Sequence, residues 1–370
     1  MYFKLIDLIN SVSCFQLAIF SFFLIHKGRK KMSNIILATF FLVQFLVILN
    51  YLMSSIFKNN ISFYIQIAYL YYPFIFLWGP LIYIYVKVLI KPDYRFKTID
   101  FLHLIPFVLA TIFIISYYYT ADDGLKFAIV TNNLIFKYLF YFNFIYYALL
   151  FAYNFSALAL LFKYQQSLKE YYSFQIKQNL VWLKFVLYGY IIACIVSAVA
   201  SVPDTYISIP YDIKINILFA TFLIFFNILF YRTMIQPHVL IQPEEKPKYV
   251  SSNIDISDIG LYSQKISFVL STEKLYLNAS LTLQELSKSI AIPERVISQV
   301  INQHWKQNFF SFINGYRVDE AKNLLNNFDQ NRLTMLGIAY DSGFNSKSAF
   351  YDAFKKHTGM TPTEYRKLKV

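Results

Sequence analysis

Long apolar runs dominate the first 235 residues of the chain, and they predict helices that cross a membrane. A helix that spans about 30 Å of hydrocarbon needs about 20 mainly apolar residues. Seven stretches have this length and composition, and we expect one transmembrane helix in each: residues 6–26, 34–57, 63–86, 101–119, 134–162, 182–202 and 215–235. Pro73, Pro80 and Pro106 are expected to kink the third and fourth of these helices.

Polar side chains interrupt these apolar stretches, and two interpretations remain open for the amides. They could line a ligand pocket, or they could form hydrogen bonds between helices, which we favour: Gln44, Asn50, Gln66, Asn143, Asn154 and Asn227. Ionisable residues near the predicted helix ends are expected to extend toward water: Asp7, Lys87, Asp100, His103, Lys137 and Lys184. Tyrosines 117–119 fall where an outer aromatic belt would lie.

The pattern changes after about residue 236, where ordinary amphipathic sequence replaces the apolar runs. Residues 236–257 read as a linker, because three prolines interrupt helix formation and charged residues favour solvent. An amphipathic helix of about 258–271 follows, with apolar residues at helical spacing. The remaining chain, residues 258–370, therefore predicts a second, helical domain with its core in 280–368.

Two helix-turn-helix units are predicted in this domain. In the first, Thr282 and Glu285 have the spacing of a capping box before a helix of 283–290, and a short turn leads to a second helix of 294–303. In the second, Thr334 precedes a short helix, residues 343–345 make the turn, and Ser346 precedes a helix that ends at His357. A helix of about 308–327 joins the units. The second helix of each unit keeps a polar face, which is the arrangement that enters a DNA major groove.

The run from Leu281 to Leu368 resembles the AraC/XylS-type DNA-binding domain. The resemblance rests on residues spread over both units: Leu283-Gln-Glu-Leu286, Tyr316-Arg317, Ala321, Leu324-Leu325, Ile338-Ala339, Gly343-Phe344, Ser346, Phe350, Phe354-Lys355-Lys356, Gly359, Thr361-Pro362 and Tyr365-Arg366. It implies an all-helical fold in which two recognition helices enter successive major grooves. By position it implies DNA contacts from Arg295, Ser298, Gln299, Asn302, Lys347, Ser348, Tyr351, Asp352, Lys355 and Lys356.

Two of these positions depart from the family pattern. Family members often carry Arg where this chain has Gln299 and Asp352. Gln can pair with adenine and Asp can accept a hydrogen bond from cytosine, so base recognition is still expected. A carboxylate near phosphate is repulsive, however, and predicts weak nonspecific binding.

The formal charge of +13 belongs mainly to the apolar half. Residues 1–241 contain 18 Lys and Arg against 8 Asp and Glu, whereas residues 242–370 contain 16 against 13, a net charge of only +3. The basic residues concentrate after the first, third and fifth apolar stretches. By the positive-inside rule, the N-terminus is outside and seven spans place the C-terminal domain in the cytoplasm.

The sequence carries no indication of catalysis, a cofactor or a metal site. Its two cysteines, Cys14 and Cys194, lie inside apolar stretches and cannot build a disulfide framework or a metal set. No metalloprotease, nucleophile-elbow, phosphate-loop or kinase motif occurs. We therefore expect a protein that is not an enzyme.

Together these patterns predict an all-α protein with a seven-helix transmembrane bundle in 1–235, a linker in 236–257 and an AraC-type domain in 258–370. The resemblance implies a sequence-specific transcription regulator in a bacterial inner membrane. Its expected partners are promoter DNA, membrane lipid, a second copy of the chain and an unidentified ligand or stimulus. The alternative is a transporter or membrane receptor whose cytoplasmic domain binds a protein. Proteolytic release of the DNA-binding domain is a third hypothesis.

Overall fold

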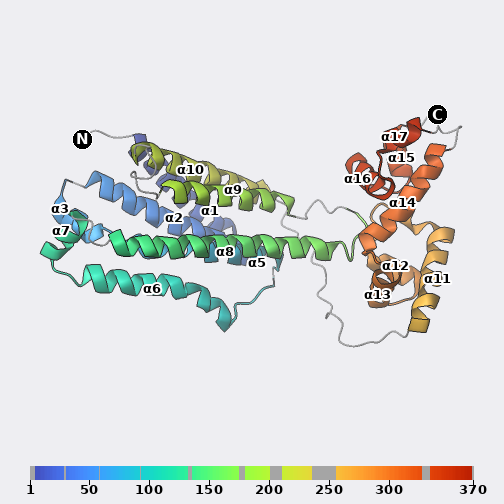
Figure 1. The fold of residues 1–370 in the computed structure, drawn as a ribbon, viewed down its shortest axis with the longest axis horizontal. Helices are drawn as coiled ribbons and strands as arrows, with labels where there is room; N and C mark the ends of the chain where they lie inside the picture. The colour runs from blue at the N-terminus through green and yellow to red at the C-terminus, as the bar shows by residue number, and fades with distance from the viewer. Residues whose placement is uncertain are drawn as a thin grey trace. The chain divides into compact units, whose positions relative to one another are not determined.

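The computed structural model describes residues 5–28, 31–57, 59–91, 93–131, 136–174, 180–200, 211–235, 256–326 and 334–368. Within these ranges all regular elements are helices, and one isolated β-bridge is present, so the predicted all-α fold is confirmed (Figure 1). The chain forms two compact units. One comprises Met1–Phe162 with Leu180–His238, and the other comprises Lys163–Asn179 with Val239–Val370. The predicted linker, apart from residues 256 and 257, lies outside the described residues.

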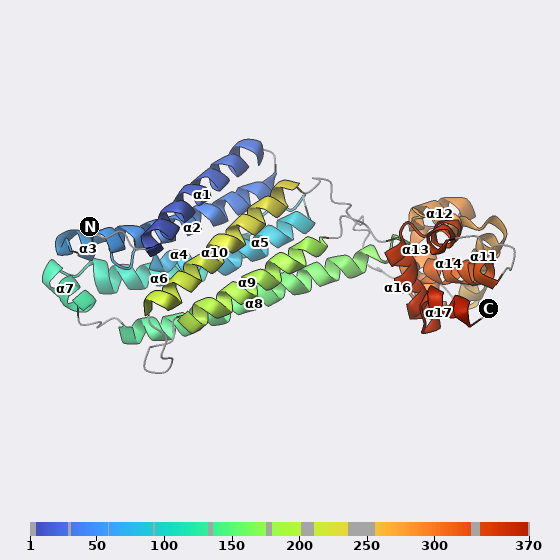
Figure 2. The same cartoon turned by 90° about the horizontal axis from the view of Figure 1, so that it is seen from above.

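The first unit contains the predicted apolar helices. Seven described segments are long and apolar enough to cross a membrane, one for each predicted stretch. Five of them are mainly single helices: α1 (Leu5–Gly28), α2 (Met32–Ile56), α8 (Phe136–Leu168), α9 (Val181–Ala200) and α10 (Tyr211–Ile235). Helix α1 packs against α2 and α10, and α9 packs against α10 (Figure 2). Cys14 and Cys194, which lie in these apolar helices, are both buried.

The third apolar segment is broken rather than kinked. It consists of α3 (Ile61–Ile67), α4 (Tyr72–Ile75) and α5 (Trp78–Ile90). Tyr69 has a φ of +63°, a left-handed conformation that ends the first helical piece before Pro73. The predicted disruption near Pro73 is therefore present, and it begins several residues earlier than the proline.

Side chains from other helices satisfy the backbone at this break. The hydroxyl of Tyr118 donates to the carbonyl oxygen of Ile65 at 2.7 Å, and that of Tyr119 donates to Ala68 at 3.0 Å. Free carbonyl groups in an apolar environment are costly, so such donors make a broken helix tolerable. Tyr118 is fully buried. The prediction of an aromatic belt was wrong for this residue.

The fourth apolar segment is also composite. It contains η1 (Thr98–Leu104), α6 (Ile105–Ile114) and the π-helical η2 (Ile115–Tyr119), and α7 (Asp123–Thr131) follows. Pro106 stands in the first turn of α6, where its missing N–H leaves no backbone acceptor unpaired. The proline thus begins a helix instead of bending one.

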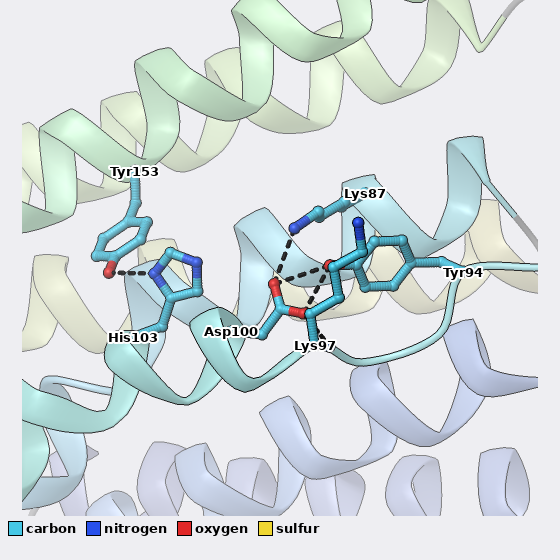
Figure 3. Close-up of polar contacts among 6 residues, drawn as sticks. All are labelled: Lys87, Tyr94, Lys97, Asp100, His103 and Tyr153. Carbon is cyan, nitrogen blue, oxygen red and sulfur yellow. Dashed lines mark hydrogen bonds and ion pairs between the residues drawn. The ribbon is translucent and has the colours of Figure 1, made fainter.

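Asp100 anchors the start of this segment (Figure 3). Its side chain is only 2% exposed and accepts hydrogen bonds from Lys87 Nζ at 2.9 Å, the Tyr94 hydroxyl at 2.6 Å and the Lys97 backbone N–H at 2.8 Å. A buried carboxylate needs such partners to offset its lost hydration. The expectation that Asp100 extends to water was wrong, and it was wrong also for Asp7, which is buried and accepts from Ser55 at 2.7 Å.

Several amides in the apolar unit join different elements, which supports the hydrogen-bonding interpretation over a ligand pocket. Asn50 Nδ2 donates to the Ile67 carbonyl at 3.0 Å, and Asn227 Nδ2 donates to Gln16 at 3.0 Å. Asn143 accepts from Tyr72 at 3.1 Å, and Gln66 donates to Asp123 at 2.9 Å. Asn154 Nδ2 bonds to its own helix.

The second unit contains eight described helices: α11 (Ile256–Glu273), η3 (Leu275–Leu277), α12 (Leu283–Ile290), α13 (Glu294–His304), α14 (Phe309–Asn326), α15 (Met335–Asp341), α16 (Lys347–Thr358) and α17 (Pro362–Lys367). The predicted caps are present, since Thr282, Thr334 and Ser346 each accept a hydrogen bond from a backbone N–H in the first helical turn. One core packs α11, α12 and α13 against the start of α14, and another packs α15 and α16 against its end.

Gly343 fixes the turn of the second helix-turn-helix unit. Its φ is +87°, and a Cβ atom there would lie 2.8 Å from Leu277 Cα and still closer to the Tyr276 carbonyl oxygen. Gly359 has a similar φ of +82° but has open space around it. Substitutions at these two positions can therefore separate the effect of backbone strain from that of steric contact.

We predict that Gly343→Ala lowers the free energy of unfolding of this unit by roughly 3 kcal/mol, from left-handed strain plus overpacking. Gly359→Ala should lower it by only about 1 kcal/mol, because strain acts alone. Hydrogen–deuterium exchange of α16 in the full chain measures both. Equal acceleration of exchange in the two variants would contradict the steric explanation.

Candidate nucleic-acid interface

The first candidate recognition helix is α13. Its apolar face, Ile297, Val300 and Ile301, is fully buried in the core. Ala291 ends α12 in a left-handed conformation (φ 54°), and Pro293 stands at the N-cap of α13. This tight connection sets the angle between the two helices.

The polar face of α13 is not open. Arg295, Ser298 and Asn302 are half-buried, and Gln299 is only 8% exposed. The prediction that Gln299 presents its amide to the outside is therefore wrong in this conformation. Its Oε1 atom is buried and finds no hydrogen-bond donor among the described residues. A buried, unpaired acceptor costs about 1–3 kcal/mol.

The second candidate recognition helix is α16, and its polar face is exposed. Phe350 and Phe354 are fully buried, which places its polar residues outside. Five of the six predicted contact residues are exposed: Lys347, Ser348, Asp352, Lys355 and Lys356. The sixth, Tyr351, is half-buried, and its hydroxyl lies 2.8 Å from Thr363 Oγ1.

Positive charge also gathers on α16. Lys347 Nζ lies 5.5 Å from the centre of the Tyr351 ring, and Lys356 Nζ donates to Ser311 Oγ at 3.2 Å. Lys355 and Lys356 occupy the last turn, where the helix dipole favours cations. Asp352 is the one acidic residue on this helix. The helix therefore combines donors for phosphate with an acceptor for a base edge.

A segment that precedes this domain by about a hundred residues is part of its structure. Residues 169–174, which follow α8 and which we call the docked segment, belong to the second unit. The backbone N–H of Leu283 donates to the Tyr171 carbonyl at 2.9 Å, and Tyr172 forms an antiparallel bridge with Thr282. The N–H of Phe310 donates to the Lys169 carbonyl at 3.0 Å. The docked segment thus joins the starts of α12 and α14.

The docked segment also reaches the polar face of α13. Asn302 Nδ2 donates to a Glu170 carboxylate oxygen at 3.3 Å and to the Ser298 carbonyl at 3.0 Å. The aromatic ring of Tyr171 packs against the core that contains α13. One of the predicted DNA-contacting residues is therefore already bound to an acidic side chain of the same chain.

Arg317 is the central polar residue of this unit. It is 1% exposed, and its guanidinium donates to the carbonyl oxygens of Tyr276 and Asn278, both at 2.8 Å. It also donates to the Ser173 carbonyl at 2.7 Å and the Ser173 hydroxyl at 2.9 Å. Burial lowers its pKa to about 10, so the group stays charged at neutral pH.

Sequence reasoning missed the docked segment altogether. Glu170 and Ser173 lie in a short polar connection between two apolar stretches, and no periodicity or motif marks them. Arg317 was noted only as part of the family pattern. A signal existed in its position, because an arginine at helical spacing with Ile313 and Ala321 faces the core and must have polar partners there.

Comparison with known proteins agrees with the helix-turn-helix geometry. Residues 286–368 match a family of helix-turn-helix domains. An uncharacterized HTH-type transcriptional regulator of Staphylococcus aureus (strain COL) is 31% identical over 120 residues, which are 32% of this chain and 15% of that protein. The melibiose operon regulatory protein of Escherichia coli (strain K12) is 26% identical over 106 residues, 29% of this chain and 33% of that protein. The chain thus covers a third or less of the length of these relatives.

Similar solved structures also cover less than a third of this chain. A Listeria innocua protein of unknown function is 28% identical and covers 30% of this chain and 98% of its own, with a TM-score of 0.26. The C-terminal domain of the two-component response regulator yesN from Fusobacterium nucleatum is 25% identical and covers 29% and 98%, with a TM-score of 0.25. The resemblance inferred from the sequence is confirmed by the family match and the relatives.

We predict that Arg317→Met lowers the stability of the second unit by at least about 3 kcal/mol, because several buried oxygens lose their donor at roughly 1–3 kcal/mol each. Lys322→Met, which changes a surface cation of the same helix, should lower it by less than about 1 kcal/mol. Pulse proteolysis in urea on the full chain measures both values. Similar midpoints for the two variants would show that the Arg317 network does not hold the unit together.

Proposed function

We propose that this chain, which carries an AraC-type helix-turn-helix domain in residues 286–368, is a membrane-bound transcription regulator that binds promoter DNA. The observation that carries the proposal is the union of that domain with seven helices long and apolar enough to cross a membrane. A protein with both parts can act on genes without a separate messenger. It is a one-component regulator.

DNA recognition is assigned to the polar faces of α13 and α16. Lys347, Lys355 and Lys356 are exposed on α16, and this exposure supports contacts with phosphate that would position the domain on the duplex. Gln299 is suited to adenine and Asp352 to cytosine. The modest net charge of residues 242–370, +3, supports weak nonspecific binding and a larger share for base contacts.

The apolar unit is proposed to be an inner-membrane sensor with its N-terminus outside. Basic residues concentrate in the connections after the first, third and fifth spans, and this asymmetry supports a cytoplasmic DNA-binding domain. The stimulus acts on the helices themselves or on their short connections, because the predicted outside loops are too short for a folded domain. Two copies of the chain in one membrane would gain affinity for adjacent half-sites through effective concentration.

The proposal is tested with the full chain in lipid nanodiscs and with genomic DNA fragments from its own source. We expect a small set of fragments to be retained. Lys347→Ala should weaken retention roughly 5- to 150-fold, and Gln299→Ala should relax preference at one base position, each worth about 1–3 kcal/mol. Lys322→Ala, which changes a lysine on α14, is the control and should have no effect.

No retention of any fragment at low salt would overturn the regulator proposal. Co-purification of the same nanodiscs with a cytoplasmic protein, lost in Lys347→Ala and kept in Lys322→Ala, would then favour a receptor or transporter with a protein partner. A soluble fragment of the C-terminal unit in cells, with no DNA bound to the membrane fraction, would instead indicate release by proteolysis.

Asp352→Asn should strengthen binding to DNA of unrelated sequence, because it removes a negative charge that faces phosphate. We expect a several-fold gain at low salt that disappears as the salt concentration rises. Fluorescence anisotropy of a labelled random-sequence duplex measures it, with Asp319→Asn on α14 as the matched charge change. An equal gain in both variants would show only a net-charge effect.

A further inference from the structure

The two candidate recognition helices differ in accessibility, and the docked segment contacts the less accessible one. On α13 the predicted contact residues are half-buried or buried, whereas on α16 five of six are exposed. The docked segment contacts α12, α13 and α14 but contributes no described hydrogen bond to α15 or α16. One half of the DNA-binding domain is thus engaged by its own chain.

The chemistry of this contact opposes DNA binding. Glu170 places a carboxylate on Asn302, at the face that would approach a polyanion. Gln299, beside it on the same face, keeps a buried acceptor without a donor among the described residues. An adenine amino group would supply that donor. In the docked arrangement the side-chain acceptor of Gln299 therefore lacks a donor, whereas a bound adenine would supply one.

The docked segment is held by a specific set of bonds. Its main chain bonds at Lys169, Tyr171 and Ser173, and Arg317 binds both the carbonyl and the hydroxyl of Ser173. Ser173 is fully buried. A segment with this many directed contacts has a defined seat on the domain and is not a chance neighbour.

The docked segment belongs to the connection between two apolar helices. Helix α8 ends at Leu168 and α9 begins at Val181, so residues 169–174 follow directly from the fifth candidate span. A change in how those helices pack would pull on the segment through the chain itself. No diffusing partner is needed for the signal.

We propose that residues 169–174 are an autoinhibitory element that occupies the first helix-turn-helix unit, and that their release from α12, α13 and α14 opens α13 to DNA. The inference rests on the proposed function, because the state that it controls is DNA binding. In the docked state only α16 is available, and the domain binds DNA through one unit. In the released state both units bind.

A disulfide that locks the docked segment tests this inference. Tyr172 and Thr282 face each other across an antiparallel bridge, a spacing that a disulfide can close. The full chain with Tyr172→Cys and Thr282→Cys is placed in nanodiscs, oxidised or reduced, and titrated with the fragment that the wild-type protein retains most strongly. We expect binding at least tenfold weaker in the oxidised form, and recovery on reduction.

The same protein serves as its own reference, so any loss of the Thr282 cap affects both redox forms alike. The single variant Tyr172→Cys is the control, and its affinity should not change on oxidation. Equal affinity of the oxidised and reduced double variant would overturn the autoinhibition. Absence of DNA binding in the wild type and in every form would overturn the proposed function instead.

A release variant gives the opposite readout. Glu170→Ala removes the contact with Asn302 and should bind the same fragment several-fold more tightly than wild type. Asp319→Ala removes one negative charge from an exposed position of α14 and should leave the affinity within about twofold. An equal gain in DNA affinity in the two variants would show that the gain comes from the change in net charge alone, and it would contradict the inference.

Discussion

The buried guanidinium of Arg317 is the interaction on which the second unit depends. A charge taken out of water is tolerated only when oxygen atoms surround it. Here those atoms come from Tyr276 in η3, from the adjacent Asn278 and from the distant Ser173, so the charge on α14 holds three parts of the chain together. Gly343 adds to this constraint, because the turn of the second unit lies directly against the backbone of η3.

The apolar unit follows the same rule with different groups. At two places a polar group of this unit has a partner from another part of the chain: Tyr118 donates at the break of the third segment, and Lys87 donates to Asp100. Hydrogen bonds in an apolar surrounding are modest in net energy, but an unmade one is costly. Such pairs therefore determine which helices can be neighbours. They also limit how far the helices can move without exposing an unpaired group.

Local features of the fold could be predicted, and distant ones could not. Thr282, Thr334 and Ser346 act within three residues of themselves, so their capping roles are visible in the sequence. The seven apolar helices were predictable because length and composition decide them. Ser173 and Arg317 are 144 residues apart, and Glu170 and Asn302 are 132 apart. No pattern in one sequence links such pairs, and the expected open face of α13 was wrong for this reason.

The bonds that seat the docked segment run mostly to main-chain atoms: the carbonyl groups of Lys169, Tyr171 and Ser173 and the N–H of Ser173. Main-chain groups are the same in every residue except proline. Evolution is consequently free to exchange most side chains of this segment so long as its path is kept. Among relatives the docked segment would then keep its backbone path while its residue types change, and sequence alignment would not detect it. A proline at position 173, which lacks the N–H, would be the substitution that natural variation avoids.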